Sequence, residues 1–456
     1  METERTAIAE FKGMESVSSL LELCRGLAGL STGDRVLIKP NLVAWDDLGP
    51  YPPWGVLTTS IVMEGLCRAL SDAGAGELKI GEGSIHCPPI GSSTQKVFDR
   101  LGYHDLAKKY GAKLVDFNRG EHQEVETNSG HVLKVAKEVF ECDFFINVPV
   151  LKTHVQTVVS LGMKNLKGLL SGKSKRYCHH PSGILESFIL ELPELFPPDL
   201  TVLDGVYSLE RGPLHFGRAR RRDLLIAGRD TFAVDLLGAH TLGYSAEEVP
   251  VLEAWADRHG RSKDAASLPV TALGDYRDRI HRKADEKLED IEQTPDLFLL
   301  QRRLPYGWDW SEDGRAPELY RTLGMDNIIL PCYDHTLCTG CSYLYSPLMV
   351  VLMSASTSSD RQFEFLTGKT MRPTGEADVT FLIGNCQVDL NRGNPACANA
   401  VEVRGCPPRL EDMFGIFQEN GLQVTMDLYN QYRQDIMKRY TDRLHLFPRE
   451  HFFVGD

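Results

Sequence analysis

The chain has 456 residues, of which 42% are hydrophobic and 25% are charged, and it carries a formal net charge of −13 at pH 7. This composition is typical of a globular protein with a buried core and excludes a disordered chain. The acidic balance argues against broad binding to nucleic acids or to an anionic membrane, but it leaves room for a local basic site.

The ends of the chain and its cysteines indicate a cytoplasmic protein. No apolar run approaches the roughly 20 residues that a membrane-spanning helix needs, and the polar first residues, METERTAIAEFKG, do not resemble a signal peptide. In a reducing compartment, eleven cysteines indicate metal or redox chemistry rather than a disulfide framework. We therefore expect a cytoplasmic protein without a membrane or nucleic-acid partner.

Residues 1–245 alternate short apolar runs with stretches whose apolar residues recur every three or four positions, which is typical of strands alternating with helices. The runs expected to form strands are RVLIKPN (35–41), LKIGEGS (78–84), KLVDFN (113–118), DFFINVPVLKTH (143–154), LTVLDGV (200–206) and DLLIAG (223–228). Such alternation favours right-handed crossovers between parallel strands. The sequence therefore predicts an α/β fold, with a mostly parallel, doubly wound sheet in a domain that spans residues 1–245.

Polar or glycine-rich residues follow several of these predicted strands. They are Lys39-Pro40-Asn41, Gly81-Glu82-Gly83, Lys152-Thr153-His154 and Asp204-Gly205. In open α/β sheets, ligands bind beyond the carboxyl ends of the strands. Because parallel strands end at the same edge of a sheet, we expect these residues to line one pocket.

The rest of the chain divides into three predicted regions. Residues 246–320 are charged and mostly helical, and we interpret them as a helical connector with a solvated face. Residues 321–430 resume the α/β pattern, with the helix SYLYSPLMVVLMSAS and the strands DVTFLIGNC and AVEVRGCPP, which predicts a second, smaller α/β domain. Residues 431–456 form a C-terminal tail that we expect to dock back on the body of the protein.

Four cysteines of the predicted second domain are expected to converge. Cys338 and Cys341 form a Cys-x-x-Cys turn before a predicted helix, whose N-terminus favours thiolates. Cys386 and Cys406 each follow a predicted strand, so that parallel pairing places them at the same edge of the sheet. The sequence therefore predicts a metal centre on these four cysteines.

The spacing of the ligands bears on the identity of the metal. Four thiolates suit either a 4Fe-4S cluster or a structural zinc ion. Structural zinc usually staples a small module without a core, whereas these ligands span about 70 residues of a sizeable domain, and Cys406-Pro407 resembles the end of cluster-binding motifs. We favour a 4Fe-4S cluster, with zinc as the alternative. The sequence leaves open whether Cys332 or Cys397 joins the site.

Six stretches of the N-terminal two thirds have a distinctive order and spacing. They are VLIKPNLV (36–43), Thr58-Thr59 before a helix, FFINVPVLKTH (144–154), LGMKNLKGLL (161–170), the Asp204-Gly205 strand exit and LERGPLHFG (209–217). Together they resemble the family called domain of unknown function 362, and the cysteine-rich C-terminal part resembles an extension found on some members. The resemblance implies the fold, a pocket and, in some members, an iron–sulfur association. It supplies no reaction.

The same stretches hold the candidate residues of the pocket. The candidate ligand-binding residues are Lys39, Asn41, Lys152, Lys164 and Asn165. Clustered lysines on an acidic protein indicate a local site for an anion such as a phosphate or a carboxylate. His154 and Asp204 are the candidate catalytic residues, because an imidazole titrates near neutral pH and a carboxylate can exchange a proton. Asp204 could equally cap a helix or a turn.

These observations support three hypotheses about function. We prefer a 4Fe-4S protein that transfers electrons to an anionic small molecule in the lysine-lined pocket or to a redox protein partner. The second is a non-redox enzyme with a structural metal centre. The third is a maturation protein that delivers a cofactor or cluster without turnover. Whether the protein is an enzyme, and on which substrate, stays open.

Overall fold

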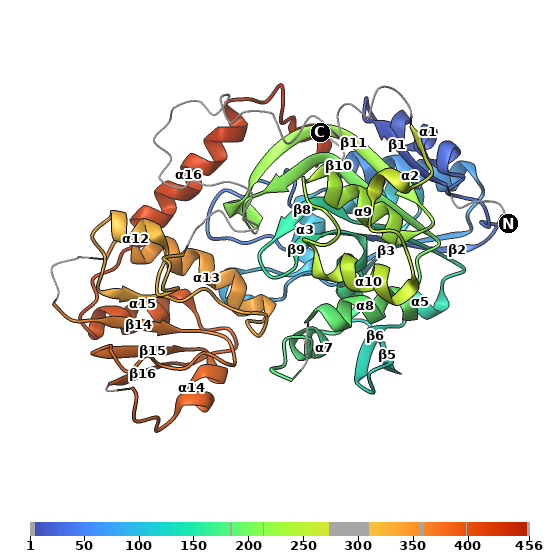
Figure 1. Cartoon of the computed structure of the whole chain (residues 1–456). Coiled ribbons are helices and arrows are strands. Elements are labelled where there is room, and N and C mark those ends of the chain that lie inside the picture. The colour runs from blue at the N-terminus through green and yellow to red at the C-terminus, as the bar shows by residue number, and fades with distance from the viewer. Residues whose placement is uncertain are drawn as a thin grey trace.

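The structure is a computed structural model that describes residues 5–182, 185–212, 214–272, 310–355, 360–397 and 399–453. Within these ranges, ten strands form a large sheet, four form a small sheet and two form a separate hairpin. Figure 1 shows the large sheet with its helices on one side of the molecule and the small sheet on the other. The chain is therefore an α/β protein with a large and a small sheet, as the sequence predicts.

The strands of the large sheet are β1 (Thr6–Glu10), β2 (Arg35–Pro40), β3 (Glu77–Glu82), β4 (Lys113–Asp116), β7 (Phe144–Val148), β8 (Val150–His154), β9 (Val158–Ser160), β10 (Leu200–Glu210), β11 (Arg218–Gly228) and β12 (Val270–Ala272). The small sheet contains β13 (Ile328–Ile329), β14 (Phe363–Leu366), β15 (Val379–Ile383) and β16 (Ala400–Val403), and the hairpin consists of β5 (His122–Glu126) and β6 (Val132–Ala136). The α-helices are α1 (Glu15–Cys24), α2 (Ser60–Asp72), α3 (Thr94–Arg100), α4 (Tyr103–Tyr110), α5 (Glu138–Glu141), α6 (Gly162–Asn165), α7 (Gly172–Tyr177), α8 (Leu185–Leu195), α9 (Thr231–Thr241), α10 (Pro250–His259), α12 (Glu318–Thr322), α13 (Thr339–Leu352), α14 (Asn385–Asn391), α15 (Leu410–Glu419) and α16 (Asp427–Thr441). Short 3-10 helices are η1 (Pro88–Ile90), η2 (Leu166–Leu169), η3 (Leu214–Phe216), η4 (Ala265–Ser267) and η6 (Arg449–His451).

The large sheet runs in the order β12-β1-β11-β10-β7-β2-β3-β4, with β8 on β10 and β9 on β8. The neighbouring strands described in this sheet pair in parallel, except that β11 and β9 run antiparallel to their partners. Strand β2 shows why the sheet is covered on both faces. Val36 and Ile38 pack into one core, and Leu37 between them packs into the other. The predicted mostly parallel, doubly wound sheet is confirmed.

The structure refines the predicted elements in two places. The run over residues 143–154 forms two strands, β7 and β8, because Pro149 between them has no N–H to donate to the ladder. In the predicted connector, Val251 and Leu252 of α10 pack into a core of the large sheet, and β12 pairs with β1. Residues 273–309 of that connector lie outside the described residues.

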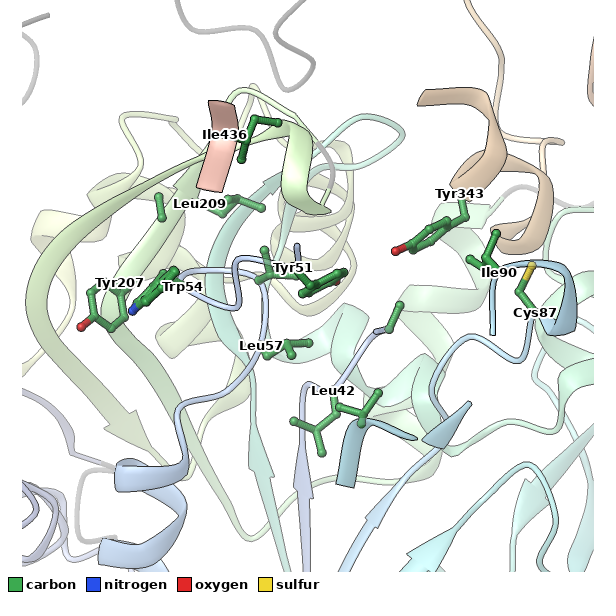
Figure 2. Packing of buried hydrophobic residues seen from close by; sticks show 14 of the residues in the cluster. Leu42, Tyr51, Trp54, Leu57, Cys87, Ile90, Tyr207, Leu209, Tyr343 and Ile436 are labelled. Carbon is green, nitrogen blue, oxygen red and sulfur yellow. The ribbon is translucent and has the colours of Figure 1, made fainter. Parts of the chain in front are cut away.

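The C-terminal tail contacts the large-sheet part of the molecule. The ring of Tyr440, in α16, stacks on Trp54 with the ring centroids 5.1 Å apart. The hydroxyl of Tyr207, in β10, hydrogen-bonds to Nδ1 of His451 at 2.8 Å. Figure 2 shows Trp54 and Tyr207 side by side in this packing. The tail thus docks on the body, as expected, through aromatic packing.

Candidate functional site

Lys39, near the end of β2, lies at the buried centre of the predicted site. Its ammonium group donates to the two oxygens of Glu82 at 2.9 and 3.0 Å and to the carbonyl of Pro40 at 3.0 Å. The side chains of Lys39 and Glu82 are only 0% and 3% exposed. The Glu82 carboxylate also accepts the backbone N–H groups of Leu42 and Gly83 at 2.9 and 2.7 Å. This ion pair is satisfied within the protein, so Lys39 builds the site rather than offering a free charge to a ligand.

Asn41, Lys152 and Asn165 meet in one hydrogen-bond network beside this pair. Asn41 Nδ2 donates to Asn165 Oδ1 at 2.8 Å, and the Lys152 ammonium donates to Asn41 Oδ1 and to the carbonyl of Val56. Asn165 Nδ2 in turn donates to Asn147 Oδ1 at 2.8 Å. The structure therefore brings together four of the predicted binding residues, namely Lys39, Asn41, Lys152 and Asn165.

The backbone at Gly168 approaches this ion pair very closely. A Cβ atom there would lie 2.4 Å from both Lys39 Nζ and Glu82 Oε1, which is closer than non-bonded atoms come. Only glycine fits this close approach. The stretch that carries Lys164 and Lys167 is thereby held against the ends of β2 and β3.

Lys164 and Lys167 differ from Lys39 because no carboxylate faces them. Neither forms an ion pair with a described residue, and Lys167 Nζ hydrogen-bonds to His179 Nε2 at 2.6 Å. Burial, and then the charges of Lys167 and Lys152, lower the pKa of Lys164 well below its usual value. A desolvated ammonium group without a counter-charge is unfavourable until an anion binds beside it.

Lys175 and His154 lie in the same electropositive surroundings. Burial lowers the pKa of both Lys152 and Lys175 to about 7. Burial, and then neighbouring lysines, lower the pKa of His154 well below its usual value, so that the imidazole is neutral. Its Nδ1 accepts a backbone N–H two residues further on, at 3.1 Å, which places the ring proton on Nε2. We call Lys152, Lys164, Lys167 and Lys175 the lysine cluster.

His179 connects the lysine cluster to the second sheet. Its Nδ1 lies 2.7 Å from the carbonyl oxygen of His335. Because a carbonyl can only accept, Nδ1 carries the proton and Nε2 accepts from Lys167. The ammonium of Lys369, which follows β14, donates to the carbonyl of His179 at 2.7 Å. Residues close to the Cys-x-x-Cys turn therefore lie directly against the lysine cluster.

Gln156, in the turn between β8 and β9, makes a second connection. Its amide Nε2 donates to the carbonyls of Asp334 and Leu337 at 2.9 and 3.1 Å. Leu337 directly precedes Cys338. Burial lowers the pKa of Lys167, and the negative charges of the Cys178 and Cys338 thiolates partly oppose this shift. The cysteine turn and the lysine cluster thus share one local electrostatic environment.

Cys338 is the N-cap residue of α13, as the predicted helix start requires. A hydrogen bond from the Cys341 thiol, the backbone N–H groups of Cys341 and Gly340, and the charge of Lys369 lower the pKa of Cys338 to about 5. A thiolate at a helix N-terminus is the form of cysteine that binds metals.

Cys386 and Cys406 lie beside each other at the carboxyl ends of β15 and β16. These strands pair in parallel, and Asn385 N donates to the carbonyl of Gly405 at 3.0 Å. Cys341 approaches the same point, since its sulfur lies 3.7 Å from where a Cβ atom of Gly384 would be. The four predicted cysteines therefore gather at one edge of the small sheet.

The four thiols also influence one another. The hydrogen bond to Cys338, burial and the charges of Cys338, Cys406 and Cys386 raise the pKa of Cys341 well above its usual value. Among the described residues, no three His, Cys, Asp or Glu side chains are grouped so that they could hold a metal ion. The metal centre therefore stays a prediction.

Two further cysteines have other surroundings. Cys332 is exposed, and its thiol points to the carbonyl of Tyr333 at 3.8 Å. Cys397 packs against a small apolar cluster, which contains Leu366, Leu382 and Val388. Packing accounts for Cys397 without a role in the centre.

Asp204 has its carboxylate engaged at the start of a helix. It accepts the N–H and the hydroxyl of Thr59, the N-cap residue of α2, at 2.7 and 2.8 Å, and the N–H of Val206 at 3.1 Å. Burial raises the pKa of Asp204 to about 6. These contacts favour the helix-capping role, and the catalytic role of Asp204 stays a prediction.

Sequence reasoning missed several residues of this site. Glu82 was expected among the residues that line the pocket, but its ion pair with Lys39 was not. His179 lay in a basic loop next to a second histidine, and that pattern alone did not separate the two. Gln156 and Lys369 carried no signal, because their role depends on contacts between distant segments.

Comparison with known proteins identifies the class of this protein. The model of the family described as domain of unknown function (DUF362) matches residues 36–240. The thylakoid-associated protein sll1697 of Synechocystis sp. (strain ATCC 27184 / PCC 6803 / Kazusa) is 31% identical over 261 residues, which are 56% of this chain and 77% of that protein. The chain therefore belongs to the family of domain of unknown function 362. The family match covers the lysine cluster and stops before the four cysteines.

A solved structure shows a weak likeness. The lactate racemase apoprotein from Thermoanaerobacterium thermosaccharolyticum matches with a TM-score of 0.31 and 14% sequence identity. The match covers 53% of this chain and 57% of the length of that protein. A likeness of this size supports no argument about fold or activity. Among the described residues of our chain, no helix has the length and apolar character needed to cross a membrane.

Proposed function

We propose that the protein binds an anionic small molecule on the lysine cluster and holds a 4Fe-4S cluster on Cys338, Cys341, Cys386 and Cys406 beside it. The observation that carries the proposal is the position of Lys167. Its ammonium group has no carboxylate partner among the described residues and lies within electrostatic reach of Cys338. When bound, the 4Fe-4S cluster would supply one-electron transfer.

The residues of the chain have distinct tasks in this proposal. Lys164 and Lys167 would bind the negative charge of the ligand, because neither forms an ion pair with a described carboxylate. Asn41 and the ion pair of Lys39 would fix the position of Lys152. The neutral His154 would donate a hydrogen bond from Nε2 to the ligand.

The cytoplasm is the location that we propose for this chemistry. All eleven cysteines are free thiols, and such a set persists in a reducing compartment. A redox protein would then serve as the partner for electron transfer. Reduction of the anionic ligand is the reaction class that we place first.

The test is to purify the protein without oxygen and to record its visible spectrum with iron, sulfide and zinc contents. We expect a broad band near roughly 400 nm with about four iron and four sulfide per chain. Cys341→Ser should abolish the band, and the matched control Cys397→Ser should leave it intact. An intact band in Cys341→Ser would contradict the ligand assignment.

The same preparation separates the alternative functions. Colourless protein with about one zinc per chain would make the centre structural. The lysine cluster would then be the candidate site of a non-redox reaction. Transfer of the iron and sulfide to an acceptor protein without turnover would support a maturation role.

A further inference from the structure

A second group of positive side chains lies on the hairpin of β10 and β11. Arg218, Arg220 and Arg222 alternate along β11, so all three fall on the same face of the hairpin. Glu210 of β10 forms ion pairs with Arg220 at 3.0 Å and with Arg222. Two of the three guanidinium groups, those of Arg220 and Arg222, therefore share the carboxylate of Glu210.

Arg218 and the nearby Arg211 have no carboxylate of their own. Neither forms a hydrogen bond or an ion pair with a described residue, and both are half-buried. Burial, and then Arg220 and Arg439 of α16, lower the pKa of Arg218. A partly desolvated guanidinium surrounded by like charges is unfavourable in the absence of an anion.

Two residues between the strands have a strained backbone conformation. Arg211 and Leu214 have φ angles of 58° and 55°, in the left-handed region that residues other than glycine rarely adopt. Such strain persists only where the surrounding structure imposes it, and it is concentrated at functional sites. The charges of Arg211 and Arg218 also interact, so the two guanidinium groups lie near each other.

Protection of a sheet edge does not account for these arginines. Charged residues often keep an exposed edge strand from pairing with another chain. On β11, however, the N–H of Ala219 already donates to the hydroxyl of Tyr440 at 3.0 Å, so α16 covers this edge. The arginines of β11 are therefore not required to keep this edge from pairing with another chain.

The arginine face is separate from the lysine cluster. Lys152 of β8 pairs in register with Leu209 of β10, so their side chains share a face of the sheet. Ser208 and Glu210, on either side of Leu209, project to the opposite face, and Arg222 Nε donates to Ser208 there at 3.0 Å. A ligand on the arginine face would therefore not compete with one on the lysine cluster.

We propose that Arg211, Arg218, Arg220 and Arg222 form a second anion site, which binds a phosphate group. The planar fork of a guanidinium matches the oxygens of a phosphate, and several such forks on one face favour a ligand with more than one anionic oxygen. The phosphate group could belong to a soluble molecule or to a lipid headgroup. The proposal does not depend on the function proposed for the lysine cluster.

The test uses the full chain with Lys164→Met and Lys167→Met, which removes the first anion site. Calorimetric titration with inorganic pyrophosphate should show one equivalent bound. Adding Arg218→Gln, alone or with Arg211→Gln, should weaken this binding about ten- to a hundredfold. Arg392→Gln, which alters an exposed ion pair with Asp389, is the matched control and should change nothing.

A second arm identifies the source of the phosphate. Sedimentation with vesicles of phosphatidylglycerol and phosphatidylcholine, lost on Arg218→Gln, would point to a lipid headgroup, whereas binding of pyrophosphate alone would point to a soluble molecule. Binding of neither probe would overturn the proposal, as would equal binding by the Arg218→Gln protein. Circular dichroism of each variant ensures that a loss of binding reflects the site and not unfolding.

Discussion

Two buried groups of charged residues in this molecule are built in opposite ways. Around Asp46, Arg433 donates to the carboxylate at 3.1 and 3.3 Å and to the carbonyl of Pro50 at 2.7 and 3.1 Å, and the Tyr343 hydroxyl donates to the same carboxylate. Asp46 and Arg433 are each only 1% exposed. Figure 2 shows Tyr343 reaching from α13 toward the loop that carries Tyr51. In the lysine cluster, by contrast, Lys164 and Lys167 form no ion pair with a described carboxylate, and Glu82 is already paired with Lys39.

The group around Asp46 therefore stabilises the fold, whereas the lysine cluster is the candidate ligand site. The group around Asp46 joins three distant segments, namely the loop after β2, α13 and α16, and every charge in it has a partner. A complete set of partners stabilises the fold and leaves nothing for a ligand. Lys164 and Lys167 form no ion pair with a described carboxylate, so the charge balance of the lysine cluster calls for an anion from outside.

The sharpest way to break this comparison is to remove a partner from the complete group. Arg433→Met leaves the Asp46 carboxylate buried without its cation, and we expect the free energy of unfolding to fall by about 3–5 kcal/mol. Urea denaturation measures it. Lys438→Met, on the same helix but in an exposed ion pair with Asp435, is the matched control and should change stability by about 1 kcal/mol or less. Equal effects of the two substitutions would contradict the structural role of Arg433.

Among the lysines of the candidate site, we likewise expect one with an ion-pair partner to stabilise the fold and one without to bind the ligand. Lys39→Met leaves Glu82 buried and uncompensated, so it should lower the free energy of unfolding by about 3–5 kcal/mol. Lys164→Met removes an ammonium without a partner, so the stability should stay the same or rise while anion affinity falls. Denaturation of both variants, with sulfate binding measured in parallel, tests the division. Marked destabilisation by Lys164→Met would show that this lysine has a structural partner.

A substitution at Gly168 should lower the free energy of unfolding by less than the loss of a buried ion-pair partner does. Gly168→Ala would push a methyl group against Lys39 and Glu82, and we expect a loss of about 1–3 kcal/mol together with weaker anion binding. Gly172→Ala is the control, because its nearest neighbour, at 3.7 Å, is the end of the Arg176 side chain. Unchanged anion binding in Gly168→Ala would show that this backbone does not position the site.

The pH dependence should be the mildest effect. The pKa of Lys152 and Lys175 is lowered to about 7, so these ammonium groups lose their protons as the pH rises through 7 in the folded protein, but only near 10.5 in the unfolded chain. Their contribution to stability therefore rises between about pH 7 and 10. Sulfate keeps its charge over this range, and its affinity should fall by up to about tenfold per pH unit above 7. Calorimetry at pH 6 and pH 8 measures the change, and equal affinities would contradict it.

Most of the fold could be predicted from local patterns in the sequence. The apolar runs at β2, β3 and β15 and the long apolar helix α13 were predicted because burial on both faces leaves an uninterrupted apolar signal. Strands β1 and β14 were missed, since each is short and no turn signal separates it from its surroundings. Pro149 indicated a break between two strands, but the long apolar run around it led to the prediction of a single strand.

The sequence predicted which residues lie in the site, but not which role each of them has. Strand-end position brought Lys39, Asn41 and Lys152 into one prediction, and the structure places them together. That Lys39 is neutralised by Glu82, whereas Lys164 is not, depends on contacts across more than forty residues of sequence. The approach of the cysteine turn to the lysine cluster depends on Gln156 and on the packing of two sheets, which no local pattern encodes.

The most direct test of the account is a calorimetric titration of inorganic pyrophosphate into protein with Arg211→Gln and Arg218→Gln, so that only the lysine cluster remains. We predict one bound equivalent, and about ten- to a hundredfold weaker binding when Lys164→Met is added, with no loss in the free energy of unfolding. Unchanged binding in the Lys164→Met protein would contradict the claim that the lysines without carboxylate partners form the ligand site.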